Sequence, residues 1–140
     1  MIYLDASAIL PMLVTEDRSA AAISFEERNR DVLFVSDFAA GEVASALSRL
    51  VRMQILPREN ADQLCERFDA WRLSATRIGS IDASDVALGM SYVRRWELKL
   101  RLPDAIHLAA CRRFGFVLAS FDARLATAAQ AVNVELAALA

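Results

Sequence analysis

Short strand-like runs alternate along this chain with longer segments of helical spacing. The strand-like runs lie at residues 2–4, 32–35, 116–119 and 132–136, and residues 77–81 could form another short strand. Helical patterns cover residues 7–14, 16–28, 36–53, 57–71, 82–98, 103–111 and 122–131. Strands that alternate with helices predict an α/β fold: a parallel sheet with right-handed crossovers and helices on both faces.

The length and the cysteine content predict a simple organisation. The 140 residues are the size of one ordinary domain, so we expect a single domain over residues 1–140. Cys65 and Cys111 lack partners at zinc-finger spacing, and we expect two free thiols in a reducing cytoplasm. No apolar stretch approaches the roughly 20 residues of a membrane span, and the first residues do not resemble a signal peptide. We therefore expect a cytoplasmic protein with no membrane association.

The net charge of −2 does not by itself indicate a nucleic-acid-binding protein. If four carboxylates formed one metal site, however, the remaining residues would carry a charge of +2. All basic residues except Lys99 are arginines, whose planar fork binds phosphate oxygens in pairs. The charge therefore leaves RNA binding open.

Four acidic residues fall where a parallel sheet places its chemistry, at the carboxyl ends of the strands. Asp5 follows the first predicted strand, Asp122 follows the strand at 116–119, and Asp104 opens a helix from the same edge. Glu42 lies about one turn into the helix after the second strand. Helix capping alone would explain each aspartate, and solvent exposure would explain the glutamate.

Convergence of the four acids would change that interpretation. Two carboxylates about 5 Å apart repel by roughly 3 kcal/mol at an effective dielectric constant near 20. A cluster must therefore bind cations or hold protons. Oxygen ligands suit Mg²⁺ or Mn²⁺, and such ions support phosphodiester hydrolysis. The sequence thus indicates a metal-dependent nuclease as one hypothesis.

Four segments in this chain resemble the VapC group of the PIN domain family. They lie at residues 3–8, 41–47, 102–110 and 119–126, and the third contains the run Asp104-Ala105-Ile106-His107-Leu108-Ala109. The resemblance covers essentially the whole chain, in order. It implies a PIN-like three-layer α/β/α fold with a five-stranded parallel sheet. It also implies an endoribonuclease toxin of a VapBC-type toxin–antitoxin module, which acts as a homodimer on RNA and is blocked by an antitoxin.

The same resemblance assigns roles to individual residues. Asp5, Glu42 and Asp104 would hold one Mg²⁺ or Mn²⁺ ion, and Asp122 would help with a second ion or with the attacking water. In-line attack would leave 5′-phosphate and 3′-hydroxyl ends. Ser7 and Ser120 would hydrogen-bond the acids or the water, with helix capping an equally open explanation. His107, the one histidine, is expected to be structural rather than a general base.

Receiver domains and aspartate-nucleophile phosphatases also place Asp after parallel strands. A receiver needs a lysine at a strand end, but the single lysine of this chain, Lys99, lies in a predicted helix. The phosphatases need a second Asp two residues after the first, and Ser7 occupies that position here. A non-catalytic module on a PIN scaffold would have lost at least one acid, and none is missing. A housekeeping RNA-processing nuclease is the main alternative to a toxin. The small size of the chain favours the toxin. The arginine pairs at 94–95 and 112–113 are either phosphate or antitoxin contacts or, by default, solvated faces.

Overall fold

The computed structural model describes residues 1–139, and its helices and strands alternate as the sequence predicts. The elements are β1 (Ile2–Leu4), α1 (Ala6–Leu13), α2 (Ser19–Asn29), the 3₁₀ turn η1 (Arg30–Val32), β2 (Leu33–Ser36), α3 (Asp37–Arg52), α4 (Arg58–Ala75), β3 (Arg77–Gly79), α5 (Ala83–Val93), the 3₁₀ turn η2 (Trp96–Leu98), α6 (Leu102–Phe114), β4 (Val117–Ala119) and α7 (Ala123–Ala131). The four strands form one parallel sheet in the order β3-β2-β1-β4.

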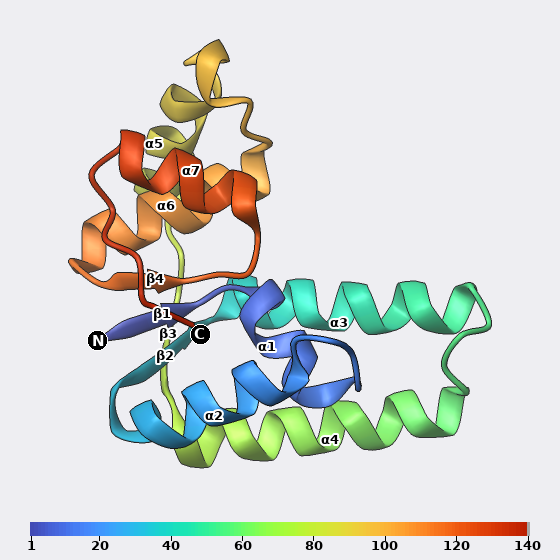
Figure 1. Cartoon of the computed structure of the whole chain (residues 1–140). Coiled ribbons are helices and arrows are strands. Elements are labelled where there is room, and N and C mark those ends of the chain that lie inside the picture. The colour runs from blue at the N-terminus through green and yellow to red at the C-terminus, as the bar shows by residue number, and fades with distance from the viewer. Residues whose placement is uncertain (140) are drawn as a thin grey trace.

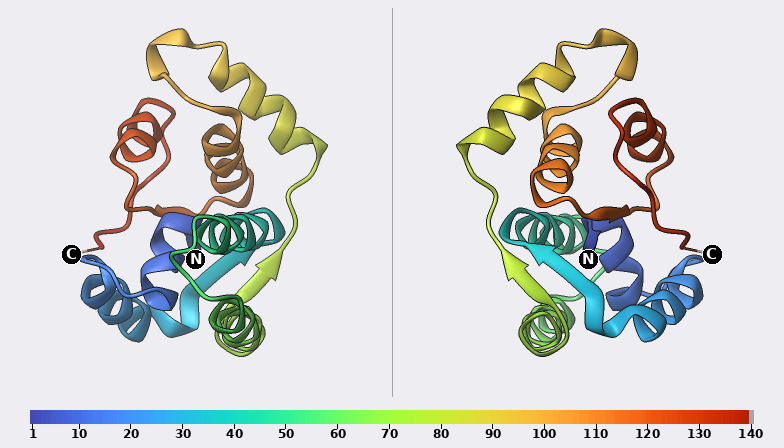
Figure 2. Two further views of the ribbon diagram at one scale, coloured as in Figure 1. Left: turned by 90° about the vertical axis from the view of Figure 1, so that its right-hand side faces the viewer. Right: turned by 90° about the vertical axis from the view of Figure 1, so that its left-hand side faces the viewer.

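The sheet separates two apolar cores. Helices α5, α6 and α7 pack on one side of it, and α1, α2, α3 and α4 pack together on the other (Figures 1 and 2). Successive residues of a strand point to opposite faces. Tyr3 and Leu118 accordingly pack into the core with α5–α7, whereas Leu4 and Ala119 pack into the core with α1–α4. Strands β1, β2 and β4 are thus buried on both faces, as is typical of a parallel sheet, whereas the edge strand β3 is largely exposed.

Four helices begin at the capping residues that the sequence predicts. Asp5, Ser36, Asp82 and Asp122 occupy the N-cap positions of α1, α3, α5 and α7, and each side chain accepts a backbone N–H of the first turn. Two of these caps, Asp5 and Asp122, directly follow β1 and the loop after β4. The capping geometry therefore brings both carboxylates to the carboxyl edge of neighbouring strands, since β1 pairs with β4.

The expected fifth strand at 132–136 is wrong: the sheet has four strands, and this segment contributes a single bridge between Leu136 and Leu118. Its first residues are tied to the end of α7, where the Val134 N–H donates to the carbonyl of Ala129. Asn133 there has a left-handed backbone, with φ of 58°. Only residues 135–137 remain extended beside β4, so the pairing ends after two hydrogen bonds, both to Leu118.

A helix expected at residues 82–98 also ends early. Helix α5 stops at Val93, and η2 then leads to Lys99, whose backbone is left-handed with φ of 53° and ψ of 35°. The chain turns there and enters α6 through Arg101. In the described part of the chain, residues 1–139, no helix is long and apolar enough to cross a membrane.

Candidate active site

Asp5 is the most buried of the four predicted acids, with 4% of its surface exposed. One carboxylate oxygen accepts the Ala8 N–H at 3.0 Å and the Ser7 hydroxyl at 2.8 Å, and the other accepts the Ser120 hydroxyl at 2.6 Å. Burial raises the pKa of Asp5 above its usual value, and the hydrogen bond from Ser120 opposes that shift. Asp5 is therefore a desolvated carboxylate that hydroxyl groups, rather than a paired cation, hold in place.

The hydroxyls of Ser7 and Ser120 join the two loops of the site. Their oxygens lie 3.1 Å apart. Ser7 also accepts the Phe121 N–H at 2.8 Å, and Ser120 accepts the Asp122 N–H at 3.0 Å. Each serine thus connects the Asp5 carboxylate to the loop that carries Asp122. The contact that the PIN resemblance implied, serine to acid, is present in the structure.

Asp104 and Asp122 share a surface hollow of about 370 Å³. Asp104 lies in the first turn of α6 and is half-buried. Desolvation raises its pKa; nearby Asp122 and Glu42 add to the shift, while Arg101 and His107 oppose it. Asp122 uses one carboxylate oxygen to cap α7, accepting the N–H groups of Arg124 and Leu125 at 2.8 and 3.1 Å. Asp104 thus lies close enough to both Asp122 and Glu42 for their charges to affect its carboxyl group.

Glu42 is held by a partner that sequence reasoning missed. Its carboxylate accepts a hydrogen bond from the Nε2–H group of His107, with the two atoms 2.5 Å apart. On the other side of the ring, Nδ1 lies 2.8 Å from the Tyr3 hydroxyl, which lies 2.7 Å from the Ser36 hydroxyl. Burial raises the pKa of Tyr3, so the phenol keeps its proton. The histidine is structural, as predicted, but it also orients an acid of the site. One sequence feature could have indicated this role: His107 lies three residues after Asp104 in the same helix, and therefore close to the site.

The four acids do not form a ready metal cage. Among residues 1–139, no group of three or more His, Cys, Asp and Glu side chains is arranged to hold an ion. Asp104 and Asp122 line one hollow, and Glu42 lines another of about 420 Å³ with Asp37 and Phe38. The donor set nevertheless fits a hard divalent cation, because all its ligand atoms are carboxylate oxygens. Two of these carboxylates also have raised pKa values that a cation would relieve.

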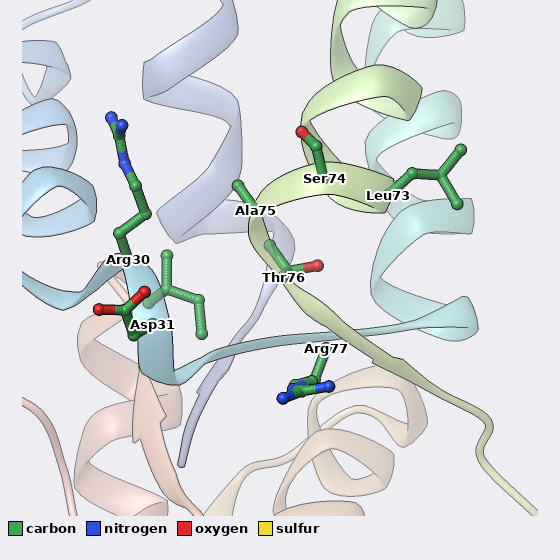
Figure 3. A pocket seen from close by; sticks show the side chains of 8 residues that line it. Arg30, Asp31, Leu73, Ser74, Ala75, Thr76 and Arg77 are labelled. Carbon is green, nitrogen blue, oxygen red and sulfur yellow. The ribbon is translucent and has the colours of Figure 1, made fainter.

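A larger hollow of about 500 Å³ lies elsewhere, between the end of α4 and the start of β2 (Figure 3). Its lining includes Asp31 flanked by Arg30 and Arg77. Because β2 begins there, this hollow lies at the amino edge of the strand, opposite the edge that carries the acids. A single carboxylate beside arginines is no catalytic cluster, so the acidic edge is the candidate site.

The fold and the acidic edge define a class of protein, and comparison with known proteins names it. The PIN domain profile matches residues 2–131. A ribonuclease VapC45 of Mycobacterium tuberculosis is 33% identical over 98% of this chain and 94% of its own length. The chain belongs to the PIN domain family. Its relatives at this level of identity carry the name ribonuclease VapC.

Solved structures agree on the fold. The sarcin–ricin loop cleaving toxin VapC20 of Mycobacterium tuberculosis superimposes with a TM-score of 0.75 at 21% identity, over 91% of this chain and 95% of that one. VapBC2 of Rickettsia felis, bound to a DNA fragment from its promoter, gives 0.72 at 14% identity, over 98% of both chains. The expected PIN-like α/β fold is thus confirmed, with four strands instead of five.

Proposed function

We propose that this protein is a metal-dependent endoribonuclease and the toxin of a VapBC-type toxin–antitoxin module. The observation that carries the proposal is the meeting of acids from separate elements at one sheet edge, where burial raises the pKa of Asp104 and the nearby charges of Asp122 and Glu42 add to that shift. Repulsion between these carboxylates destabilises the fold, and a bound divalent cation would remove it by binding to their oxygens. The identity to ribonuclease VapC over nearly the whole chain supports RNA as the substrate.

Each residue has a distinct role in this proposal. Asp5, Glu42 and Asp104 hold one Mg²⁺ or Mn²⁺ ion, and Asp122 assists a second ion or orients the attacking water. The metal supplies, when bound, a lowered pKa for water and a positive charge near the phosphate that is cleaved. Ser7 and Ser120 fix both oxygens of Asp5, and His107 fixes Glu42. These hydrogen bonds limit the movement of the carboxylates.

The activity is tested with the purified chain, free of any partner. Wild-type protein is incubated with total cellular RNA in Mg²⁺, in Mn²⁺ and in EDTA, and the ends of the products are mapped. We expect cleavage in either metal, none in EDTA, and products with 5′-phosphate and 3′-hydroxyl ends. Cleavage that persists in EDTA, or products with 2′,3′-cyclic ends, would exclude the proposed chemistry.

The toxin role is tested in cells. Toxin–antitoxin complexes such as VapBC2 and one from Klebsiella pneumoniae share this fold, and we propose that the chain has an antitoxin of its own. Induced expression should arrest growth, and co-expression of a small protein encoded beside it should restore growth. Normal growth on strong induction of active enzyme would favour the alternative, a housekeeping RNA-processing nuclease.

A homodimer belongs to the same proposal. Light scattering after size exclusion should give twice the 15.4 kDa mass of one chain. A monomeric mass across the concentrations used for the cleavage assay would contradict this part and leave the activity untouched.

A further inference from the structure

The hollow that holds Asp104 and Asp122 is unusually rich in cations. Eight residues line it, and half of them are basic: Arg18, Lys99, Arg101 and Arg124. With the two acids, the lining has a net charge of +2, whereas the whole chain has −2. Basic side chains are therefore concentrated beside the acidic site, although the overall charge does not announce a nucleic-acid-binding protein.

Helix electrostatics does not account for these cations. Arg18 and Arg101 occupy the N-cap positions of α2 and α6, and Arg124 lies in the first turn of α7. The positive end of a helix dipole disfavours basic side chains, and neither arginine at an N-cap makes a capping hydrogen bond. An anionic ligand would explain the arrangement, because it would interact favourably with the arginines and with the helix N-termini together.

The four basic side chains differ in how firmly neighbouring residues hold them. Arg18 is fixed: Nη1 donates to the Phe121 carbonyl at 2.5 Å, and the guanidinium carbon lies 5.2 Å from the centre of the Phe121 ring. Arg101 is far looser, since its side chain is 83% exposed and its Nε lies 3.8 Å from the Asp104 carboxylate. Lys99 and Arg124 are exposed as well. Three cations are thus available to a ligand, beside a rigid Arg18–Phe121 stack.

We propose that this hollow binds the backbone of single-stranded RNA next to the phosphate that is cleaved. Lys99, Arg101 and Arg124 contact phosphates, and the Arg18–Phe121 stack supports a base. The volume of about 370 Å³ falls within the range of small-ligand sites, roughly 300–1,000 Å³. The inference rests on the proposed function, because it takes Asp104 and Asp122 to be the catalytic side of the same hollow.

The test measures binding without catalysis. Anisotropy of a fluorescent single-stranded RNA is followed in EDTA, over a series of salt concentrations, for wild type, Lys99→Gln, Arg101→Gln and Arg124→Gln. Arg58→Gln is the matched control, because Arg58 also opens a helix, α4, whose first turn lies far from α7 (Figure 1). Because no metal is present, a failure of the nuclease proposal and a failure of this one appear in separate experiments.

We expect each variant to bind RNA roughly two- to fivefold more weakly, the range of an exposed ion pair. The slope of log affinity against log salt should fall by about 0.7 for each lost phosphate contact. Unfolding midpoints should be unchanged or higher, since the helix dipoles disfavour these cations. The Arg58→Gln control should match wild type in all three measurements.

Two results would overturn the inference. One is wild-type RNA binding that none of the three variants weakens beyond the Arg58→Gln control. The other is weaker binding of the cognate antitoxin by the variants while RNA binding is unchanged, which would assign the hollow to an acidic protein segment instead.

Discussion

Asp5 combines a charge with near-complete burial, and this makes its effect on stability depend on pH. Burial raises its pKa in the folded state, so the folded protein binds a proton more tightly than the unfolded chain does. The contribution of Asp5 to the free energy of unfolding is therefore most favourable below the unfolded pKa, about 3.9, and it falls as pH rises through the folded value. Above its folded pKa the ionised side chain costs stability, which a bound cation would restore.

Asp5→Asn should consequently be more stable than wild type at neutral pH in EDTA. Asparagine also caps helices well, so α1 keeps its N-cap. The stability difference should shrink as pH is lowered, because the wild-type carboxyl becomes neutral. Urea unfolding across the pH range measures this, with Asp62→Asn, an exposed acid in α4, as control. A variant less stable than wild type by the same amount at every pH would contradict the account.

Substitution of Ser7 or Ser120 should affect the rate of RNA cleavage. Removing the Ser120 hydroxyl frees one oxygen of Asp5, and removing the Ser7 hydroxyl leaves the other oxygen bound only to the Ala8 N–H. Either change also removes a hydrogen bond to the loop that carries Asp122. We expect Ser7→Ala and Ser120→Ala each to lower the cleavage rate roughly 10- to 100-fold, the usual effect of losing a group that orients a metal ligand. Single-turnover cleavage measures it, with Ser91→Ala as control. Rates equal to the control would limit both serines to helix and loop capping.

At the scale of elements, α5 and α6 are joined by a buried ion pair. Asp85 is 1% exposed, and Arg113 donates to both its oxygens at 2.8 and 2.7 Å and to the Ser80 carbonyl at 2.9 Å. The Arg113 guanidinium also packs over the Phe114 ring at 4.1 Å. Arg113 is thus a structural residue, and the sequence-based suggestion that it contacts phosphate or antitoxin is not needed.

Arg113→Gln should leave the Asp85 carboxylate buried without its charge partner. Breaking a fully buried pair costs about 3–5 kcal/mol; because the Arg113 side chain is 32% exposed, we expect about 2–3 kcal/mol of lost unfolding free energy. Urea unfolding at neutral pH checks the value. The exposed Arg94→Gln in the same protein should cost under about 0.5 kcal/mol, and an equal effect of the two substitutions would contradict a buried pair.

Across the whole molecule, the sequence predicted what local patterns determine. Strand–helix alternation predicted the parallel sheet, and the capping residues Asp5 and Asp122 predicted where helices begin. It could not predict contacts that depend on the packed fold. The bond between Glu42 and His107 joins α3 to α6, 65 positions apart in the chain. The apolar run at 132–136 looked like a strand, but the tight end of α7 left only residues 135–137 to pair.

The same limit applies to the site. The sequence pattern predicted that four acids lie at one edge of the sheet. It did not predict that Glu42 lines a different hollow from the one that Asp104 and Asp122 share. The sequence also did not predict the basic lining. Its four residues are far apart in the chain and meet only because the N-terminal ends of α2, α6 and α7 lie together: Arg18, Lys99, Arg101 and Arg124.

If the four carboxylates together support metal-dependent RNA hydrolysis, neutralising any one of them should abolish most of the activity. Single-turnover RNA cleavage in Mn²⁺ is compared for wild type, Asp5→Asn, Glu42→Gln, Asp104→Asn and Asp122→Asn, with Asp62→Asn as control and with folding checked for each. We predict a loss of at least about 100-fold, several kcal/mol of transition-state stabilisation, in each of the four, and wild-type rates for the control. Undiminished cleavage by well-folded Asp5→Asn and Asp104→Asn would contradict the claim.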